Sequence, residues 1–337
     1  MKFDASLLVH KLEQMPASAR FADDAGFDGI WTFETAHEPF LPLVLAAEHS
    51  SRLSLGTSIA VAFPRSPTIL AQIAWDLARY SKGRFILGLG TQVRGHNERR
   101  FSVKWEKPVE KIREVILAIR AIWDCWQNRT RLDFQGEFFK LTLMTPFFSP
   151  EPHEYHRIPI FVAGVNRRMC QLAGEMCEGF HAHPLHSVRY LRERVLPNIE
   201  VGLTQSGRER KSIELSSTIF VVPTDDPKAA AYEAEIREQL SFYASTPPYR
   251  PVFDLEGWGE IADRLKGLAA RGEWNAMPSL INDEMLERFA VRGTWAELPE
   301  KVIKKYDGLL DRVSYYFPLV LGENKSKWRA TVEAFKQ

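Results

Sequence analysis

The feature that most constrains the fold of this chain is a regular alternation of short apolar runs and longer amphipathic segments. Eight runs of four to ten residues are rich in β-branched or aromatic residues and are bounded by Gly, Pro or charge, which is typical of buried strands. At least one segment with helical periodicity follows each run. The expected strands are Phe3–Val9, Gly29–Glu34, Leu53–Val61, Phe85–Gly90, Ile158–Ala163, Gly179–His183, Ile213–Val222 and Arg312–Val320.

The segments between these runs predict helices. Pro108–Trp126 has the clearest pattern, because its apolar residues recur at spacings of three and four. Pro42–Ser50 and Pro67–Tyr80 begin with proline, which suits the first turn of a helix. The other expected helices are Pro16–Ala25, Arg167–Met176, Val188–Val201, Pro227–Ser245, Ala296–Gly308 and Asn324–Phe335.

This order of elements predicts an α/β fold with a parallel sheet, because right-handed βαβ units build such sheets. Eight units close into a (β/α)8 TIM barrel, which typically needs about 250 residues. We therefore expect a single barrel domain over residues 1–337, with insertions after strands 4 and 7 at about 127–157 and 246–294. The first insertion resembles a hairpin over 131–141 that turns at Gln135-Gly136, and the second holds helix-like pieces at Gly257–Ala270 and Asp283–Phe289.

An open nucleotide-binding sheet is the competing architecture. It requires G-x-G-x-x-G after its first strand. The nearest match, Gly88–Val93, follows the fourth expected strand and has Val93 in place of the third glycine. The sequence does not favour that fold.

The net charge and the cysteine content argue against several classes of partner and of cellular location. Lys plus Arg is 44 and Asp plus Glu is 43, so the net charge of +1 argues against nucleic acid or an acidic membrane as a partner. Three cysteines are too few for a disulfide framework, and the apolar run near residue 8 is too short for a signal peptide or membrane span. We expect a cytoplasmic protein that acts on a small molecule.

Candidate catalytic residues follow the expected strands, because barrel active sites lie at the carboxyl ends of the strands. His37 follows the second strand, and a histidine there can exchange a proton near neutral pH, although a loop histidine can also simply pack or cap. Loop aromatics such as Phe40, Phe63 and Tyr249 are candidates for the wall of an apolar pocket around a flat ring system.

A candidate anion site lies after the fifth strand. Gly164-Val165-Asn166-Arg167 reads as a tight turn that opens a helix, where free N–H groups and the helix dipole favour phosphate. The alternative is an ordinary helix start with solvated arginines. The basic stretch from Arg94 to Arg100 is either a solvated face or a contact for an anionic cofactor tail.

His181 and His183 raise a metal-site alternative. Side chains two apart on a strand point the same way, so this pair has metal-ligand geometry. A metal site needs a third or fourth ligand, and the last two strands supply no histidine. We therefore predict no metal, with His183 lining a substrate pocket, and keep a metal-dependent barrel hydrolase as an alternative of another class.

Several stretches, in order along nearly the whole chain, resemble the bacterial luciferase-like superfamily of flavin and deazaflavin oxidoreductases. The post-strand sequence E-T-A-H-E-P-F together with G-L-G-T-Q-V is most similar to the branch that depends on coenzyme F420, a deazaflavin. The stretches that carry the resemblance are Phe21–Trp31, Glu34–Phe40, Leu55–Ala60, Gly83–Gln92, Ile160–Gly164, Leu172–Glu175, Gly179-Phe180 and Gly293-Thr294.

The resemblance implies roles for individual positions. Ser58-Ile59 aligns with a strand bulge that carries a non-proline cis peptide behind the cofactor ring, and Thr91-Gln92 with residues near the polar edge of that ring. His37 aligns with the catalytic histidine of F420-dependent sugar-phosphate dehydrogenases. The phosphate clamp of the family corresponds to Ala163, Gly164, Val165, Asn166 and Arg167.

Two positions depart from those dehydrogenases. Ala36 stands where they have Asp, and Val93 stands where they have a Glu acid, so a sugar phosphate is not the expected substrate. The resemblance thus implies hydride transfer between coenzyme F420 and a small organic substrate in a homodimeric enzyme. The alternatives are an FMN-dependent monooxygenase on the same fold and a cofactor-binding protein without catalysis.

Overall fold

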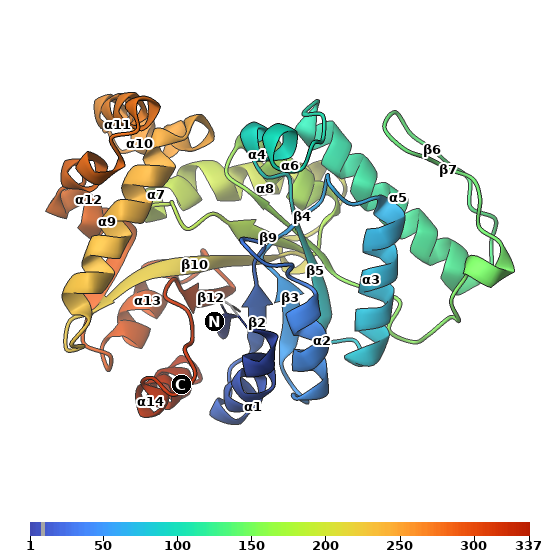
Figure 1. Cartoon of the computed structure of the whole chain (residues 1–337), viewed down its shortest axis with the longest axis horizontal. Helices are drawn as coiled ribbons and strands as arrows, with labels where there is room; N and C mark the ends of the chain where they lie inside the picture. Colours follow the sequence, from blue (N-terminus) through green and yellow to red (C-terminus); the bar gives the residue numbers. More distant parts are fainter. Residues whose placement is uncertain (8–10) are drawn as a thin grey trace.

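The computed structural model describes residues 1–7 and 11–337 and contains a closed barrel of eight parallel strands (Figure 1). Each strand pairs in parallel with the next, and the last pairs with the first, so the predicted (β/α)8 barrel is confirmed. The end of the expected strand at Leu8 and Val9 lies outside the described residues. The barrel strands are β1 (Lys2–Leu7), β2 (Gly29–Thr32), β3 (Ser54–Thr57), β5 (Phe85–Gly90), β8 (Ile160–Gly164), β9 (Gly179–Ala182), β10 (Glu214–Pro223) and β12 (Arg312–Tyr315).

Helices surround the barrel on its outside. Every helix predicted from the sequence is present, with ends shifted by a few residues. The described part of the chain contains no helix long and apolar enough to cross a membrane. The helices are α1 (Met15–Ala25), α2 (Leu41–Glu48), α3 (Pro67–Tyr80), α4 (Arg94–Arg99), α5 (Pro108–Asn128), α6 (Arg167–Met176), α7 (Val188–Tyr190), α8 (Leu196–Gln205), α9 (Ala229–Ser245), α10 (Arg250–Leu255), α11 (Gly259–Arg271), α12 (Asp283–Phe289), α13 (Leu298–Tyr306) and α14 (Lys325–Phe335), with the π-helical turn η3 (Leu191–Val195) between α7 and α8.

The segment 127–157 contains the predicted hairpin, formed by the antiparallel strands β6 (Phe134–Gln135) and β7 (Lys140–Leu141). It turns at 136–139 and not at Gln135-Gly136, because Gln135 still pairs with Lys140. The hairpin projects beside α5 at the right of Figure 1. Its four-residue loop is held by Glu114 of α5, whose carboxylate accepts N–H groups from Glu137 at 2.9 Å and Phe138 at 2.7 Å.

The segment 246–294 contains α10, α11 and α12, a 3-10 helix η6 (Trp274–Leu280), and a strand, β11 (Ala290–Gly293), that the sequence did not predict. β11 pairs in parallel with the carboxyl half of β10. Four residues that directly follow a helix have too little periodicity to be recognised as a strand.

The inside of the barrel is closed at one end by a buried ion pair. Arg312 and Asp4 are each 1% exposed, and two nitrogens of the guanidinium lie 2.7 and 2.9 Å from the carboxylate oxygens. Trp31 Nε1 also donates to Asp4 at 2.7 Å. Further along the barrel axis, Trp31 packs with Ile86 and Phe161 in a separate apolar cluster. This layer is the floor beneath the carboxyl ends of the strands.

Candidate active site at the carboxyl ends of the strands

The loops after β2, β3 and β5 lie together, because these strands are consecutive neighbours in the barrel. Ser58 N–H donates to the carbonyl of Thr32 at 2.7 Å, and Ala62 N–H donates to the carbonyl of Gly90 at 3.0 Å. The short strand β4 (Ala60–Val61) extends this contact by pairing with the end of β5. The predicted segments near residues 37, 58 and 91 therefore meet at one edge of the barrel.

His37 lies in an exposed bend between β2 and α2. Among the described residues, no group lies within hydrogen-bond distance of its ring. The loop itself is fixed, since the carboxylate of Glu38 accepts the N–H groups of Phe40 at 2.8 Å and Leu41 at 2.9 Å at the start of α2. His37 is thus held at the mouth by its backbone while its imidazole faces solvent, and its catalytic role stays a prediction.

The peptide bond between Ser58 and Ile59 is cis, as the resemblance implies. Both residues are half-buried, and the side chain of Ile59 covers Gly90, where an added Cβ would lie 2.6 Å from Ile59 Cδ1. Glu34 braces the segment by accepting the N–H of Val61 at 2.8 Å.

Thr91 and Gln92 are half-buried at the end of β5. Gln92 has a left-handed backbone, with φ of 58°, and its side-chain oxygen accepts the N–H of Val93 at 3.0 Å. The side chain of the buried Asn97 donates to the carbonyl of Thr91 at 2.8 Å. Asn97 belongs to α4, a short helix that the sequence did not predict, and α4 thereby fixes the polar end of β5.

The turn from Gly164 to Arg167 lies at the start of α6, as predicted. Asn166 is the N-cap residue but does not cap the helix with its side chain, which instead donates to the carbonyl of Pro248 at 3.2 Å. Tyr190 OH donates to the carbonyl of Val165 at 3.1 Å. The first turn of α6 therefore has no side-chain acceptor, and the exposed Arg167 adds positive charge, which together fit a phosphate.

Small residues face the barrel interior next to this turn. An added Cβ at Gly88 would lie 3.1 Å from His181 Nε2, so Gly88 faces inward, and Gly90 shares that face because strand side chains alternate. Ala163 faces inward as well, because it is paired with His181 on β9. The Thr57 carbonyl and the Ile59 side chain fill the space next to Gly88 and Gly90, so these glycines let the segment after β3 pack against β5.

Phe40 and Phe63, predicted to line a pocket, are 3% and 6% exposed within the main hydrophobic core. The ring of Phe40 lies 6.5 Å from that of Phe85, and the ring of Phe63 lies 5.9 Å from that of Trp105. Both rings pack against neighbours on the β5 and α4 side of the barrel, so a substrate-contacting role for them stays a prediction.

His181 and His183 lie at the end of β9 but make different contacts. His181 is buried between Trp31 and Phe161, with ring centroids 4.8 and 5.2 Å apart, and its Nδ1 lies 2.5 Å from Ser216 Oγ. Burial lowers its pKa from 6.5 to about 3, so the ring is neutral. Across residues 1–7 and 11–337 there is no group of three or more His, Cys, Asp or Glu that could hold a metal ion. The metal-dependent hydrolase alternative has no support in this part of the chain.

The sequence missed Tyr243, which contacts His183, and Tyr316, whose hydroxyl lies next to that of Tyr243. Tyr243 of α9 contacts the His183 ring edge-on with centroids 4.6 Å apart, and the Tyr243 hydroxyl lies 2.8 Å from that of Tyr316, the residue after β12. Tyr249, which the sequence suggested as a pocket aromatic, lies 4.3 Å from the His183 ring. Tyr243 lies on a helix and is far from His183 in the sequence, so no local pattern could have found this contact.

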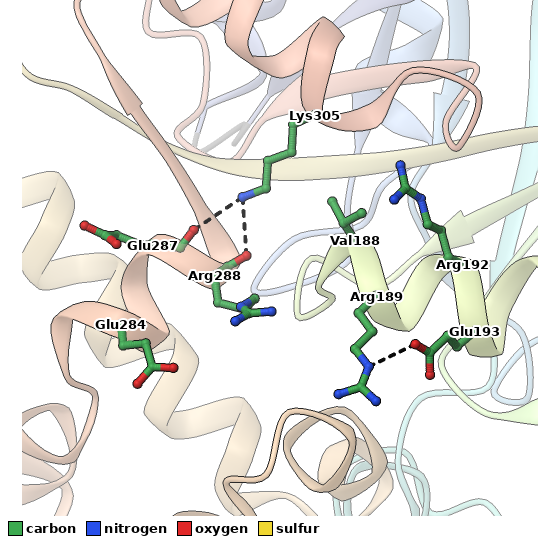
Figure 2. Close-up of a pocket in the computed structure, with 8 residues that line it drawn as sticks. All are labelled: Val188, Arg189, Arg192, Glu193, Glu284, Glu287, Arg288 and Lys305. Atoms are coloured by element: carbon green, nitrogen blue, oxygen red, sulfur yellow. Dashed lines mark hydrogen bonds and ion pairs between the residues drawn. The ribbon is translucent and has the colours of Figure 1, made fainter.

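A cavity of about 510 Å³ lies away from these residues, between η3 and α12 (Figure 2). None of the predicted site residues lines it. Three of its cations already have partners: Arg189 pairs with Glu193 at 2.9 Å, Arg288 pairs with Glu256 at 3.1 Å, and Lys305 donates to the carbonyl of Ala290 at 2.8 Å. We therefore assign the functional site to the carboxyl ends of the strands.

Comparison with known proteins identifies the family and the fold of this chain. The family model for luciferase-like monooxygenases matches residues 2–312. An uncharacterized protein of Mycobacterium tuberculosis is 44% identical over 338 residues, which cover 100% of this chain and 98% of that protein. The 5,10-methylenetetrahydromethanopterin reductase of Archaeoglobus fulgidus is 25% identical over 317 residues, which cover 92% and 90%. A solved structure with the same fold is that of the coenzyme F420-dependent tetrahydromethanopterin reductase of Methanopyrus kandleri. It superposes with a TM-score of 0.77 at 20% identity, and the match covers 98% of this chain and 96% of that one.

Proposed function

Because this chain belongs to the luciferase-like monooxygenase family and is an oxidoreductase, we propose that it transfers hydride between coenzyme F420 and a small organic substrate. The observation that carries the proposal is the uncapped first turn of α6, which lies at the same end of the barrel as the Ser58–Ile59 bulge. Such a turn suits the phosphate of a cofactor whose flat ring lies beside the Ser58–Ile59 bulge.

Each predicted segment has a role in this proposal. The turn 163–167 binds the phosphate, Thr91 and Gln92 face the polar edge of the ring, and the Ser58–Ile59 bulge lies behind it. When bound, the deazaflavin supplies the redox chemistry as a hydride carrier, while the protein orients the substrate and excludes water. His37 is placed to exchange a proton with substrate at the mouth.

Relatives of this chain support F420 as the cofactor. The chain is 27% identical, over 289 residues, to a Mycobacterium tuberculosis protein named as a putative coenzyme F420-dependent oxidoreductase. The runner-up is an FMN-dependent monooxygenase, which the name of the family itself favours. We also expect a homodimer, as the family resemblance implies, and a cytoplasmic location.

Equilibrium binding tests the cofactor. Coenzyme F420 and FMN are titrated side by side against the purified chain, with cofactor fluorescence as the readout. We expect at least a tenfold preference for F420, which corresponds to about 1.4 kcal/mol. A preference for FMN, together with oxygen consumption during turnover, would support the monooxygenase instead.

Arg167→Gln serves as a matched variant in the same titration. It removes the exposed charge at the first turn of α6 and leaves the backbone N–H groups in place. We expect weaker binding of F420 by several-fold. Arg192→Gln, an exposed arginine on η3, is the control and is expected to bind as the wild type does.

A further inference from the structure

The cluster around His183 has the composition of a binding subsite. His183 directly follows β9 and Tyr316 directly follows β12, so both lie at the same end of the barrel as the cofactor segments. Tyr249 brings the cluster next to the cofactor turn, because its neighbour Pro248 accepts the hydrogen bond from Asn166. These contacts place His183, Tyr243, Tyr249 and Tyr316 beside the proposed phosphate site.

The ring of His183 is held in one protonation state. The backbone N–H of Leu185 donates to His183 Nδ1 at 3.1 Å, so Nδ1 carries a lone pair and the proton is on Nε2. His186 Nδ1 donates to the carbonyl of His183 at 2.7 Å and braces the same turn. Burial lowers the pKa of His183 from 6.5 to about 3, so the ring stays neutral at physiological pH. His183 therefore offers a hydrogen-bond donor and no charge.

The tyrosine hydroxyls supply the complementary acceptor. Tyr316 OH donates to the side-chain oxygen of Gln239 at 3.1 Å. Its proton is thereby used, so the hydroxyl 2.8 Å away on Tyr243 donates to Tyr316. The remaining lone pairs of Tyr243 can accept a hydrogen bond. This donor and this acceptor belong to two rings whose centroids lie 4.6 Å apart. Together they match an alcohol group, which needs both, and a ketone, which needs only the donor.

We infer that His183, Tyr243, Tyr249 and Tyr316 form the subsite that holds the oxygen-bearing part of an uncharged alcohol or ketone on an apolar frame. This inference rests on the proposed function and names its substrate class. Within the described residues, no charged side chain makes a hydrogen bond or ring contact with these four residues. A carboxylate or phosphate here would lose its hydration without gaining a countercharge, which is strongly unfavourable.

Ligand-observed NMR titration of the purified chain tests the inference with ligands of one shape. Cyclohexanone and cyclohexanol are the uncharged probes, and cyclohexanecarboxylate is the charged one. The test variants are His183→Phe, which keeps an aromatic ring but removes the N–H, and Tyr243→Phe. Tyr232→Phe is the matched control, because Tyr232 lies on the same helix and stacks on Phe317 with centroids 4.8 Å apart.

We expect the wild type to bind cyclohexanone and cyclohexanol at least tenfold more tightly than the carboxylate. His183→Phe should weaken both uncharged probes about tenfold, and Tyr243→Phe should weaken cyclohexanol more than cyclohexanone. Tyr232→Phe should change neither. Tighter binding of the carboxylate, or equal binding of the uncharged probes by all variants, would overturn the inference.

A parallel titration separates this inference from the proposed function. Coenzyme F420 is titrated against the same three variants, and circular dichroism verifies their folding. We expect F420 affinity within twofold of the wild type for each variant. If the wild type fails to bind F420 while the pattern with cyclohexanol and cyclohexanone holds, the cofactor assignment is wrong and the subsite stands.

Discussion

Burial sets the charge of three histidines near the barrel mouth. Loss of hydration lowers the pKa of His181 and His183 to about 3 and that of His186 to about 4, from an ordinary value of 6.5. Each ring is neutral in the folded chain but takes up a proton when the chain unfolds below pH 6.5. The unfolded state therefore binds more protons in that range, and stability rises with pH.

Because the free energy of unfolding rises with pH, we predict that the folded chain loses stability in acid. The contribution of these histidines is fully present above about pH 7 and is lost as the pH falls toward 4, by about 1.4 kcal/mol per pH unit for each histidine. Urea unfolding of the wild type and of His186→Gln at pH 7.0, 6.0 and 5.5 measures the slope. The variant should show a slope that is shallower by about 0.6 proton on average over this range, and equal slopes would contradict this account.

Among single residues, we expect substitution of Arg312 to lower the free energy of unfolding the most. Its partner Asp4 is also 1% exposed, so Arg312→Leu leaves a buried carboxylate with only Trp31 as a side-chain donor. We expect the free energy of unfolding to fall by about 3–5 kcal/mol. Chemical denaturation measures it. The double variant Asp4→Leu/Arg312→Leu should regain part of that loss, and no recovery would show that packing dominates instead.

At the scale of elements, α6 and α8 approach closely through two glycines. An added Cβ at Gly174 would lie 2.1 Å from the carbonyl oxygen of Ile199, and one at Gly202 would lie 2.0 Å from that of Gln171. Both obstacles are backbone atoms, which cannot rotate away. The position of α6, and hence of its first turn at the proposed cofactor site, depends on this contact.

Gly174→Ala is therefore expected to lower the free energy of unfolding by about 1–3 kcal/mol and to weaken binding of F420. Gly267→Ala on α11 is the matched control, because its nearest neighbour there is the flexible end of Arg271 at 3.5 Å. That control should raise stability by up to about 1 kcal/mol, since alanine favours helix. Thermal melting and F420 titration check both, and a stable Gly174→Ala variant with normal affinity would refute the argument.

The helices and strands differ in how well the sequence predicts them. Eight strands and the hairpin after α5 were predicted because their signals are local: short runs rich in β-branched or aromatic residues, helical periodicity between them, and turn residues. β11 and α4 were missed because they are short and owe their conformation to neighbours. The positions of Ser58 and Gln92 came from the family resemblance alone, whereas the contact between His183 and Tyr243 exists only once β9 and α9 are placed in space.

For the whole molecule, barrel closure is what brings the candidate site together. The segments near residues 37, 58, 91 and 165 follow β2, β3, β5 and β8, and Tyr316 follows β12. The sequence predicted that arrangement because eight βα units leave few other topologies. It could not predict that Tyr243 contacts His183, because that contact depends on how α9 is placed in space.

The expected homodimer is a prediction at this scale. Sedimentation equilibrium of the purified chain should give twice the chain mass of 38.6 kDa. The measurement is made at several loading concentrations and with F420 present. A mass of one chain throughout would contradict the expectation without affecting the assignment of the site, since the residues discussed all belong to one chain.

The pairing of β1 with β12 also governs when the chain can fold. Asp4 and Arg312 are separated by 308 positions, so the ribosome releases β1 long before β12 exists. Until then one edge of the nascent sheet has no neighbour and can recruit strands from other chains. Synthesis of this protein thus includes an interval of vulnerability to aggregation that ends only when its last strand emerges.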